Sequence, residues 1–597
     1  LHRIIKLFTN KHTCELYERH IQAVDSIARK YKDGFQISDL PQVARIISLA
    51  CDSILLGHVG FVEPLCEVLN VCGKDFIQSR ANEMFRSKDI ICDMIVVMAS
   101  MMLCAPPRVC MAAASALQHT FEMKDFRDAE GTPAAVGIPT DGEKNDLRPN
   151  QWSFNQQVVD RSGVIKIIVA SLRKLLETVE NEKGGVEEKP EISLREDETV
   201  WDAADQLKPS ESERNRLLHL EVLRCGICLV RELSFSPANA RTLIKEGVPL
   251  ICIHALDIAD DFKDRLVSNC IDIIWNLLET SSNELMNRDN IARSRAKLIE
   301  KRRSTNCLRV LGVPKSLNVL RRLLEQSLVS GFRAVDKELR NNVLVVASIL
   351  ARHKENHVHF ITSGLLDLLL LYACAPEIGL PAPAETHNYG TKSQFDFELK
   401  RLMWQLISDL CMVENDVISP ITQMAHKVVS QMPITETLLM YVDHTSLDHR
   451  ALKLWSAPQL RVLRIDACGL LGVLLRVNEC ATKFVESDGP RLVLNFLQKV
   501  TASPLAQMLD ETTQPQQDQN GDSMNNSSSN NNLAQGQSYM TLGAQTTQTM
   551  SKESMIARSI VHDTELELAA VRLLSHCSAL PEAAIVSHLG SNGAVGT

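Results

Sequence analysis

Apolar residues recur at helical spacing along almost the whole chain. In residues 395–411, "FDFELKRLMWQLISDLC", six of them fall at i, i+3, i+4, i+7, i+8 and i+11, which is one face of an α-helix. They are Leu399, Leu402, Met403, Leu406, Ile407 and Leu410. Asp396 stands just ahead of this run and can cap its N-terminus. The pattern predicts an amphipathic helix over this segment.

A second run repeats the spacing but is apolar on nearly every side. Its helical face is made by Leu460, Leu463, Ala467, Leu470, Leu471, Leu474 and Leu475. Val462, Ile465 and Val473 add apolar side chains to the remaining faces. A helix that is apolar all round must be buried between other helices. The sequence therefore predicts helices packed in more than one layer.

Several segments share one order of elements: a buried helix, a polar turn containing Asn, a short helix, a Gly and another apolar helix. The clearest copy is 228–256, and 343–373 and 469–497 repeat its order. Residues 159–176 keep only the second half. The glycine of each copy is where a helix can end in a left-handed residue before the next one begins.

The spacing of these glycines indicates a repeat array. Gly163, Gly247, Gly364 and Gly489 are separated by 84, 117 and 125 residues. Two, three and three units of about 40 residues would fit these intervals, which is the period of armadillo and HEAT repeats. We therefore predict an all-α fold, an α-solenoid of armadillo/HEAT-like helical repeats with disordered insertions. An irregular all-α multidomain protein is the alternative.

Changes in composition predict the domain boundaries. We expect N-terminal helical repeats over 1–123, a loop insertion over 124–156 and an armadillo-like array over 157–500, with an acidic insertion at 177–213. Residues 501–553 are predicted to be a disordered linker because Gln, Asn, Ser and Thr predominate and cannot bury a core. Residues 554–597 are predicted to start a further, truncated repeat.

Charge and composition narrow the function classes. The chain has 597 residues and a formal net charge of −9, and segment 177–213 alone carries thirteen acidic and four basic residues. An acidic chain disfavours nucleic acid and anionic membrane surfaces as partners. The longest uncharged apolar stretch, 94–105, is too short to cross a bilayer. The seventeen cysteines lie in helical runs without framework spacing, so we expect reduced thiols. Because the chain starts at Leu1 and stops inside an apparent repeat, we expect both ends to be cut.

Motifs of catalysis and cofactor binding are absent. The chain lacks a GxxxxGK[ST] loop, a GxSxG elbow and an HExxH helix. The one CxxC, Cys225 to Cys228, lies in a helical run, where two buried thiols are expected instead of a redox or metal site. His353 and His357 stand one helical turn apart near His359, and solvated side chains are expected there more than metal ligands. We predict a non-enzyme with no catalytic, cofactor or metal residues.

One basic stripe is a candidate binding site. Segment 288–303 contains seven basic and two acidic residues. The basic ones are Arg288, Arg293, Arg295, Lys297, Lys301, Arg302 and Arg303. They could contact microtubules or another acidic partner. A solvated helix, or a partner for the chain's own acidic insertion, is the alternative interpretation.

The tryptophans do not form the ladder of import receptors. In those armadillo proteins, Trp is followed by Asn four residues later, and none of the five tryptophans has this neighbour. They are Trp152, Trp201, Trp275, Trp404 and Trp455. Asn276 directly follows Trp275 instead. We expect the tryptophans to be core residues.

Three phrases carry a resemblance to a known family. They are "CIDIIWNLLETSSNELM" (270–286), "FDFELKRLMWQLISDLC" (395–411) and "LWSAPQLRVLRIDACGLL" (454–471). With "IIKLFTNKHTCELYERHIQAV" near the start, they resemble the cilia- and flagella-associated protein 69 family, in the same order over about the first 500 residues.

The resemblance implies an armadillo-type scaffold of the axonemal central pair apparatus. Such a protein would sit in a C1 microtubule projection of cilia and sperm flagella and support their assembly and motility. Its expected partners are other projection proteins, with tubulin of the microtubule as a further candidate, and no nucleic acid, membrane or cofactor. The expected location is the axoneme, within cytoplasm and cytoskeleton. The alternative function is a cytosolic cargo or signalling adaptor that binds extended peptides.

Overall fold

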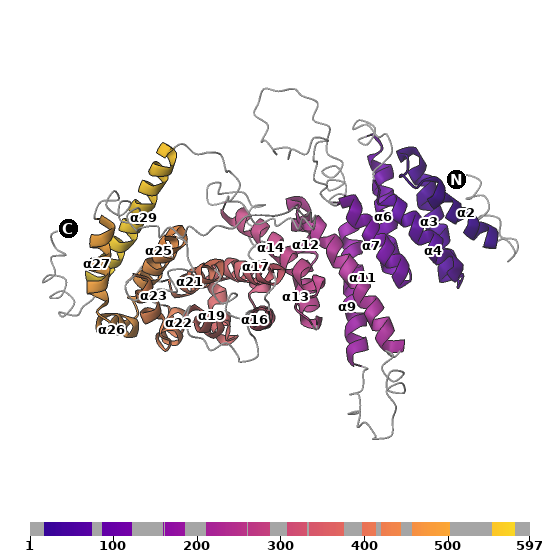
Figure 1. The fold of residues 1–597 in the computed structure, drawn as a ribbon. Helices are drawn as coiled ribbons and strands as arrows, with labels where there is room; N and C mark the ends of the chain where they lie inside the picture. The colour runs from indigo at the N-terminus through magenta and orange to yellow at the C-terminus, as the bar shows by residue number, and fades with distance from the viewer. Residues whose placement is uncertain are drawn as a thin grey trace, which may run out of the picture. The chain divides into compact units, whose positions relative to one another are not determined.

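The computed structural model describes most of the chain in twelve stretches. These are residues 17–74, 86–121, 159, 162–184, 211–259, 261–286, 307–330, 334–374, 397–412, 419–442, 457–501 and 552–578. Within them every regular element is a helix (Figure 1). The chain forms two compact units, Leu1–Leu365 and Leu366–Thr597. The all-α prediction is confirmed.

The first unit contains the helices up to α18. Its long helices are α2 (Tyr17–Lys30), α3 (Leu40–Leu55), α4 (Val62–Cys72), α6 (Lys88–Cys104), α7 (Pro107–Phe121), α9 (Val164–Gly184), α11 (Glu211–Ser234), α14 (Arg265–Met286), α16 (Pro314–Ser330) and α17 (Ala334–Ala351). Shorter ones are η2 (Ile37–Asp39), η3 (Val59–Phe61), α12 (Pro237–Lys245), α13 (Val248–Ile258), η4 (Lys354–Asn356) and α18 (His357–Thr362).

The second unit continues the same series. Helix α19 (Leu365–Ala373) starts at the boundary. It is followed by α21 (Phe397–Cys411), α22 (Pro420–Ser430), α23 (Ile434–Val442), α25 (Ala457–Leu474), α26 (Asn478–Glu486), α27 (Gly489–Thr501) and α29 (Lys552–Ser578). The two apolar runs singled out in the sequence are α21 and α25.

Two ladders of helices organise the first unit. We call the stack α2, α4, α7, α11, α14 and α17 the first-helix ladder, because each member packs on the next (Figure 1). The stack α3, α6, α9, α13 and α16 is the third-helix ladder, in which neighbours also pack pairwise. In the second unit, α21, α25 and α29 continue the first pattern and α23 and α27 the second. Contact only between neighbours is the hallmark of a solenoid.

The core is aliphatic, as the low aromatic content requires. In α25 the side chains of Leu463, Ala467, Leu470, Leu471 and Leu474 are buried. In α21 the equivalent face is buried as well, with Trp404 added to it. Leu402 and Leu460, which the sequence placed on the same faces, are half-buried. Helical periodicity thus located the buried faces, with deviations at their edges.

The repeat glycines adopt the left-handed backbone in three of four copies. Gly163, Gly247 and Gly364 have φ of 74°, 81° and 70°. In the fourth copy the prediction is wrong: Asp488 is left-handed, with φ of 57°, and Gly489 is the first residue of α27. Gly489 has another reason to be glycine, because a Cβ there would lie 2.6 Å from the ring and from the carbonyl oxygen of Phe484.

The asparagine of the repeat turn is buried in two copies. Asn239 and Asn356 are almost completely enclosed. The Asn356 amide nitrogen donates to the carbonyls of Leu350 and Leu308, at 3.0 and 3.3 Å. Gly312 makes room for it, since a Cβ at that position would lie 2.1 Å from Asn356 Oδ1. This side chain therefore joins one helical turn to the preceding repeat.

Helices extend into the edges of two predicted insertions. Helix α9 runs to Gly184, so the first eight residues of the acidic segment 177–213 are helical, and α11 starts at Glu211. The central part of that segment, the predicted loop 124–156 and residues 502–551 of the predicted linker 501–553 lie outside the described residues. The two ends of that linker are helical, in α27 and α29. Of the truncated repeat predicted at 554–597, residues 554–578 belong to α29.

The outer face of α29 is apolar and exposed. The buried residues Leu463, Ala467, Leu470 and Leu474 of α25 match Leu566, Ala570, Leu573 and Cys577 of α29, at a constant separation of 103 residues. In α25, buried Cys468 faces Cys577 of α29. The matching residue of α29 is Val571, and 49% of it is exposed, as is 47% of Leu568 one turn earlier. No described helix covers this face.

Candidate protein-interaction surface

A hollow opens on the third-helix ladder where α16 packs on α13. It has a volume of about 530 Å³ and is lined by Asp257, Lys315, Asn318, Val319, Arg321, Arg322 and Glu325. Three of these side chains are cationic and two are carboxylates. The stacking of the two helices creates it: its charged residues stand on the outward faces, and the buried Val319 belongs to its floor.

Arg322 is fixed in place by α13. Its guanidinium donates to the carbonyl of Leu256 at 3.1 Å, and Nη1 lies 3.3 Å from Asp257 Oδ1. The carbonyls at a helix C-terminus have no partner within the helix, so an arginine that reaches them also caps α13. Arg322 is therefore a structural cation that links the two repeats.

Lys315 and Arg321 are held more loosely. The Lys315 ammonium lies 4.0 Å from Asp257 Oδ2, and 72% of its side chain is exposed. Arg321 Nη2 lies 3.9 Å from Glu325 Oε2 with 43% of the side chain exposed. Pairs at this distance and exposure contribute little to stability. Both cations can turn toward a carboxylate of a bound partner at little energetic cost.

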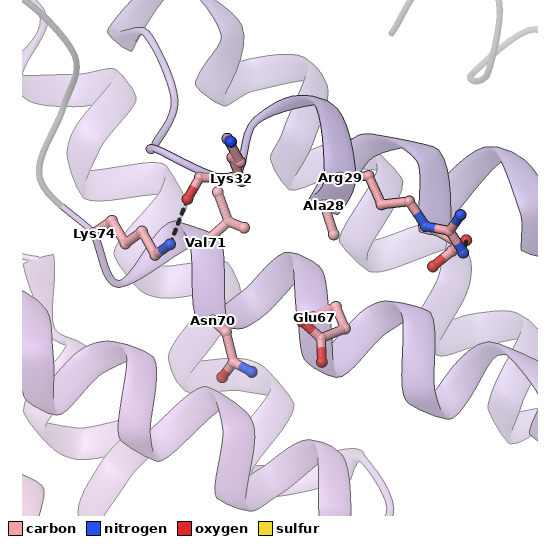
Figure 2. A pocket seen from close by; sticks show the side chains of 8 residues that line it. Ala28, Arg29, Lys32, Glu67, Asn70, Val71 and Lys74 are labelled. Carbon is pink, nitrogen blue, oxygen red and sulfur yellow. Dashed lines mark hydrogen bonds and ion pairs between the residues drawn. The ribbon is translucent and has the colours of Figure 1, made fainter.

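A second hollow lies between α2 and α4 in the first-helix ladder (Figure 2). Its volume is about 460 Å³. Lys74 crosses one end and donates to the backbone carbonyl of Lys32, while Arg29 is paired with Asp25 at 2.5 Å on α2 itself. Glu67 and Asn70 of α4 face the opening. Like the first hollow it holds three cations and two carboxylates, but Lys74 and Arg29 are engaged by the Lys32 carbonyl and by Asp25, so they are less free to turn toward a partner.

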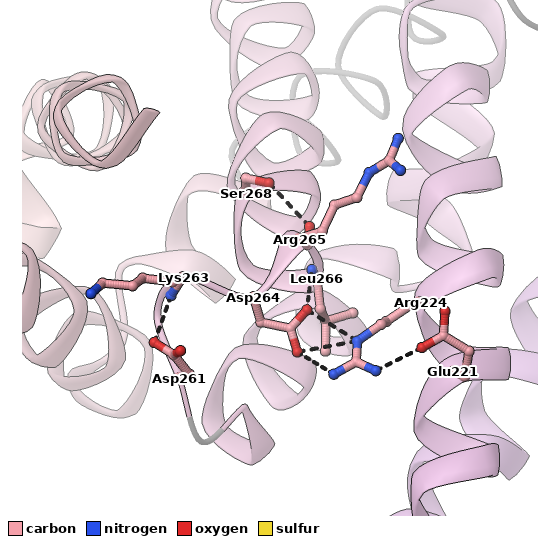
Figure 3. Close-up of polar contacts among 8 residues, drawn as sticks. All are labelled: Glu221, Arg224, Asp261, Lys263, Asp264, Arg265, Leu266 and Ser268. Carbon is pink, nitrogen blue, oxygen red and sulfur yellow. Dashed lines mark hydrogen bonds and ion pairs between the residues drawn. The ribbon is translucent and has the colours of Figure 1, made fainter. Parts of the chain in front are cut away.

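Arginine–aspartate pairs join neighbours of the first-helix ladder. Arg224 of α11 donates from Nη2 to Asp264 Oδ2 at 2.6 Å and from Nη1 to Glu221 Oε2 at 2.7 Å (Figure 3). Asp264 also accepts the backbone N–H of Leu266 at 2.9 Å and so caps the start of α14. One carboxylate thus completes a helix end and ties it to the previous repeat.

These contacts have electrostatic consequences. Hydrogen bonding to Asp264 raises the pKa of Arg224 against the effect of its burial. Burial by itself would raise the pKa of Asp264, but the hydrogen bonds from Arg224 and Leu266 outweigh it and lower that pKa. For Asp272 of α14 burial prevails: its pKa is raised although Arg231 donates to it at 2.9 Å.

The same joint recurs in the second unit. Val222, Ile227, Leu229 and Leu233 of α11 match Leu399, Trp404, Leu406 and Leu410 of α21, at a constant separation of 177 residues, and all eight are buried. In this register Arg224 corresponds to Arg401, which donates to Asp466 of α25 at 2.9 Å. Repeats in both units therefore use an arginine at one position to reach the next helix of the ladder.

The residues singled out from the sequence do not line the hollow between α13 and α16. The basic stripe with Arg288, Arg293, Arg295, Lys297, Lys301, Arg302 and Arg303 lies outside the described residues. Cys225 and Cys228 are in α11, as expected for a helical CxxC. The expectation of solvated histidines is wrong for His357, which is buried with Nε2 2.6 Å from the carbonyl of Ala351. Trp404 is a core residue as predicted, and Trp275 is half-buried.

Sequence reasoning did not single out Lys315, Arg321 and Arg322. Their signal was present in "PKSLNVLRRLLEQSLVS", where cations occupy the polar face of an amphipathic helix. The same pattern is found on any solvated helix, so it acquires meaning only from the packing of α16 on α13. In the stretches that the structure describes, no group of three His, Cys, Asp or Glu residues could hold a metal ion. Nor does any described helix have the length and apolarity needed to cross a membrane.

Comparison with known proteins identifies the family. The sequence profile described as "Cilia- and flagella-associated protein 69, ARM repeat" matches residues 1–186 and 210–503. The chain belongs to the cilia- and flagella-associated protein 69 family. The match takes in the described helices of the first unit and those of the second unit up to α27, and it ends before α29. The helical repeats are thus of the armadillo type, as their period of about 40 residues predicted.

Individual relatives agree with this assignment. Cilia- and flagella-associated protein 69 of Homo sapiens is 23% identical over 412 residues, which are 69% of this chain and 35% of that protein. The Mus musculus protein is 22% identical over 499 residues, 83% of this chain and 43% of the relative. The chain thus spans less than half the length of these curated relatives. A designed armadillo repeat protein of known structure is 11% identical, with a TM-score of 0.31, and covers 64% of this chain and 99% of its own.

Proposed function

We propose that this protein is a non-enzymatic scaffold of the axonemal central pair apparatus, in a C1 microtubule projection. It would support the assembly and motility of cilia and sperm flagella by holding other projection proteins on its solenoid surface. The membership in the cilia- and flagella-associated protein 69 family carries this proposal. The two ladders support it, because stacked repeats present long rows of helix faces to partners.

The hollow between α13 and α16 is our proposed contact point for an acidic segment of a partner. Lys315 and Arg321 are exposed and only loosely paired, so a carboxylate that replaces those pairs gives up little. Arg322 is bonded to the end of α13 and would keep the floor of the hollow rigid. The predicted basic stripe at 288–303 precedes α16 in sequence and would add further positive charge.

Localisation in motile cilia tests the scaffold function. A tagged protein is expected along the axoneme of normal cilia and should be absent from axonemes that lack the central pair. Signal that persists without the central pair, or that is confined to cytosol or nucleus, would overturn the proposal. The second result would favour a cytosolic adaptor that binds extended peptides.

Charge reversal tests the hollow. The variant Lys315→Glu with Arg321→Glu is compared with the wild type by crosslinking in isolated axonemes. We expect fewer crosslinks between α16 and other axonemal proteins, and we expect salt washes to remove more of the variant from the axoneme. Arg309→Glu with Arg108→Glu is the matched control, because it changes the net charge equally and both side chains, 64% and 70% exposed, pair with Glu355 and Glu63 away from the hollow. Equal effects of both variants would assign the loss to net charge alone and remove the hollow from the proposal.

Direct microtubule binding is a separate test of the basic stripe. Reversing Arg293, Lys297, Lys301 and Arg302 to Glu should weaken co-sedimentation with microtubules and make it less sensitive to salt. Unchanged pelleting of the variant would show that these residues do not contact tubulin.

A further inference from the structure

Three thiols converge where the third-helix ladder begins. Cys51 is near the end of α3, Cys104 is the last residue of α6, and Cys110 lies in α7. The thiols of Cys51 and Cys104 lie within interaction range, since Cys104, after burial, raises the pKa of Cys51, and α3 packs directly on α6. The Cys104 thiol itself donates to the carbonyl of Ser100 at 3.1 Å. Two neighbouring repeats therefore place one sulfur each at the same point of their interface.

The third thiol also lies near this pair, because Cys104 and Cys51 add to the effect of burial in raising the pKa of Cys110. Cys110 donates to the carbonyl of Ala105 at 3.0 Å and lies 3.4 Å from that of Met101, which also accepts the backbone N–H of Ala105. Cys110 is thus engaged with the backbone at the end of α6. Because these carbonyls hold Cys110, Cys51 is taken as the partner of Cys104.

Solvent exposure distinguishes the Cys51–Cys104 pair from a second pair of neighbouring cysteines. Cys104 is exposed, whereas Cys51 is buried. Cys252 of α13 and Cys270 of α14 also lie within interaction range of each other, but both are completely buried. An oxidant dissolved in water can reach Cys104 and cannot reach either sulfur of the second pair. The Cys51–Cys104 pair is therefore the one expected to react with an oxidant, and the Cys252–Cys270 pair is its internal control.

We propose that Cys104 and Cys51 form a reversible, peroxide-dependent disulfide that links α3 to α6. The Cys104 thiolate attacks one oxygen of hydrogen peroxide, the O–O bond breaks, and Cys104 sulfenic acid forms with release of water. The Cys51 sulfur then attacks the sulfenic sulfur, the S–O bond breaks, and the hydroxyl leaves as water with the Cys51 proton. Two thiols lose two electrons in total, and one peroxide is reduced to two waters. A small thiol such as glutathione reverses the link by exchange.

The environment of each sulfur sets this order of events. Burial raises the pKa of Cys51 to about 12, so Cys51 is a neutral thiol at physiological pH and is shielded from the oxidant. Oxidation consequently starts at the exposed Cys104, and Cys51 acts as the resolving thiol. The product crosses one joint between repeats and would restrict the movement of α3 against α6, a joint that noncovalent packing alone leaves free to flex.

Peptide mapping of the peroxide-treated chain tests the proposal. The purified protein is exposed to hydrogen peroxide, alkylated and digested without reduction. The expected product is a cross-linked peptide containing Cys51 and Cys104, with the loss of two free thiols and full recovery after dithiothreitol. A link between Cys104 and Cys110, or equal oxidation of Cys252 and Cys270, would overturn the proposal.

Single variants separate the two roles. Cys51→Ser should leave Cys104 as a sulfenic acid that dimedone traps, whereas Cys104→Ser should protect Cys51 from peroxide. Cys110→Ser is the control and should still form the link. Circular dichroism of each variant verifies that it is folded. If Cys51→Ser gives no more dimedone adduct than the wild type, Cys51 is not the resolving thiol and the proposal fails.

Discussion

Lys400 shows how a single charged residue is accommodated in an apolar repeat core. It occupies the position in α21 that Leu223 occupies in α11, and it is 6% exposed. Its ammonium donates to the Tyr441 hydroxyl at 2.6 Å and lies 5.5 Å from the centre of the Trp404 ring. A buried ammonium is tolerated only where hydrogen bonds and ring faces replace water.

Removing the hydroxyl of Tyr441 tests this arrangement. Tyr441→Phe keeps the ring, which packs edge-on against Trp404 at 5.0 Å, and removes one acceptor from the ammonium. We expect the free energy of unfolding to fall by about 1–3 kcal/mol, measured by urea denaturation. Adding Lys400→Met to Tyr441→Phe should recover part of the loss, because the buried charge is then removed as well. No loss in the single variant would contradict the role of this bond.

Asp264 gives a second prediction at the residue scale, with a defined pH dependence. Its pKa is lower in the folded state, so its stabilising effect is complete above the unfolded value of about 3.9 and disappears as pH falls through the folded pKa. Asp264→Asn should lower the free energy of unfolding at pH 7 by about 1.5–3 kcal/mol. In urea titrations the difference from wild type should shrink below about pH 4.

Asp272 is the control with the opposite sign. Burial raises its pKa in the folded state, so its ionisation destabilises the fold as pH rises through that pKa. The cost of Asp272→Asn should therefore be smaller at neutral pH than in acid. If both variants showed the same pH trend, the assignment of the two shifts would be wrong.

At the scale of the element, the sequence predicts the helices better than the conformation of the turns between them. Periodicity identified α21 and α25 and their buried faces, because a 3.6-residue repeat of apolar residues has few other solutions. It could not distinguish a glycine that is left-handed from one that avoids a clash. Gly247 is of the first kind and Gly489 of the second, and both look alike in the sequence.

The binding surface was harder to predict than the helices. The cations of the hollow are ordinary surface residues until α16 packs on α13, and nothing in the order of the residues states that packing. The Arg224–Asp264 joint also unites residues 40 positions apart. Sequence predicted the helical type of the elements and the buried faces of α21 and α25 because that information is local, whereas the joints and the hollow depend on which faces meet.

Substitutions at the two glycines distinguish their roles. Gly247→Ala forces a side chain into φ of 81° and should cost about 1–2 kcal/mol. Gly489→Ala should be as harmful or worse because Phe484 occupies the space. Asp488→Gly should be nearly neutral, because relief of the left-handed backbone offsets loss of the ion pair with Arg491. Thermal unfolding of the three variants measures this ranking. A strongly destabilised Asp488→Gly would show that the aspartate has a role beyond its backbone conformation.

At the scale of the whole molecule, the ladders predict that a destabilising substitution weakens the helices packed on it more than helices further along the array. Leu277 of α14 is fully buried, so Leu277→Ala should cost about 2–5 kcal/mol locally. Hydrogen exchange should then accelerate most in α11, α14 and α17 and least in α2, because each ladder helix packs on its neighbours. Leu217→Ala, at an exposed position of α11, is the control. A uniform loss of protection over the first unit would indicate one cooperative core instead.

The exposed apolar residues of α29 have a consequence for behaviour in concentrated solution. Exposed apolar side chains favour association between chains, and α29 exposes Leu568 and Val571. We expect light scattering of the purified chain to rise with protein concentration more steeply than for the variant with Leu568→Glu and Val571→Glu. An equal slope would mean that the face is shielded in solution. Leu568 and Val571 are therefore expected to control how readily the purified chain associates with itself.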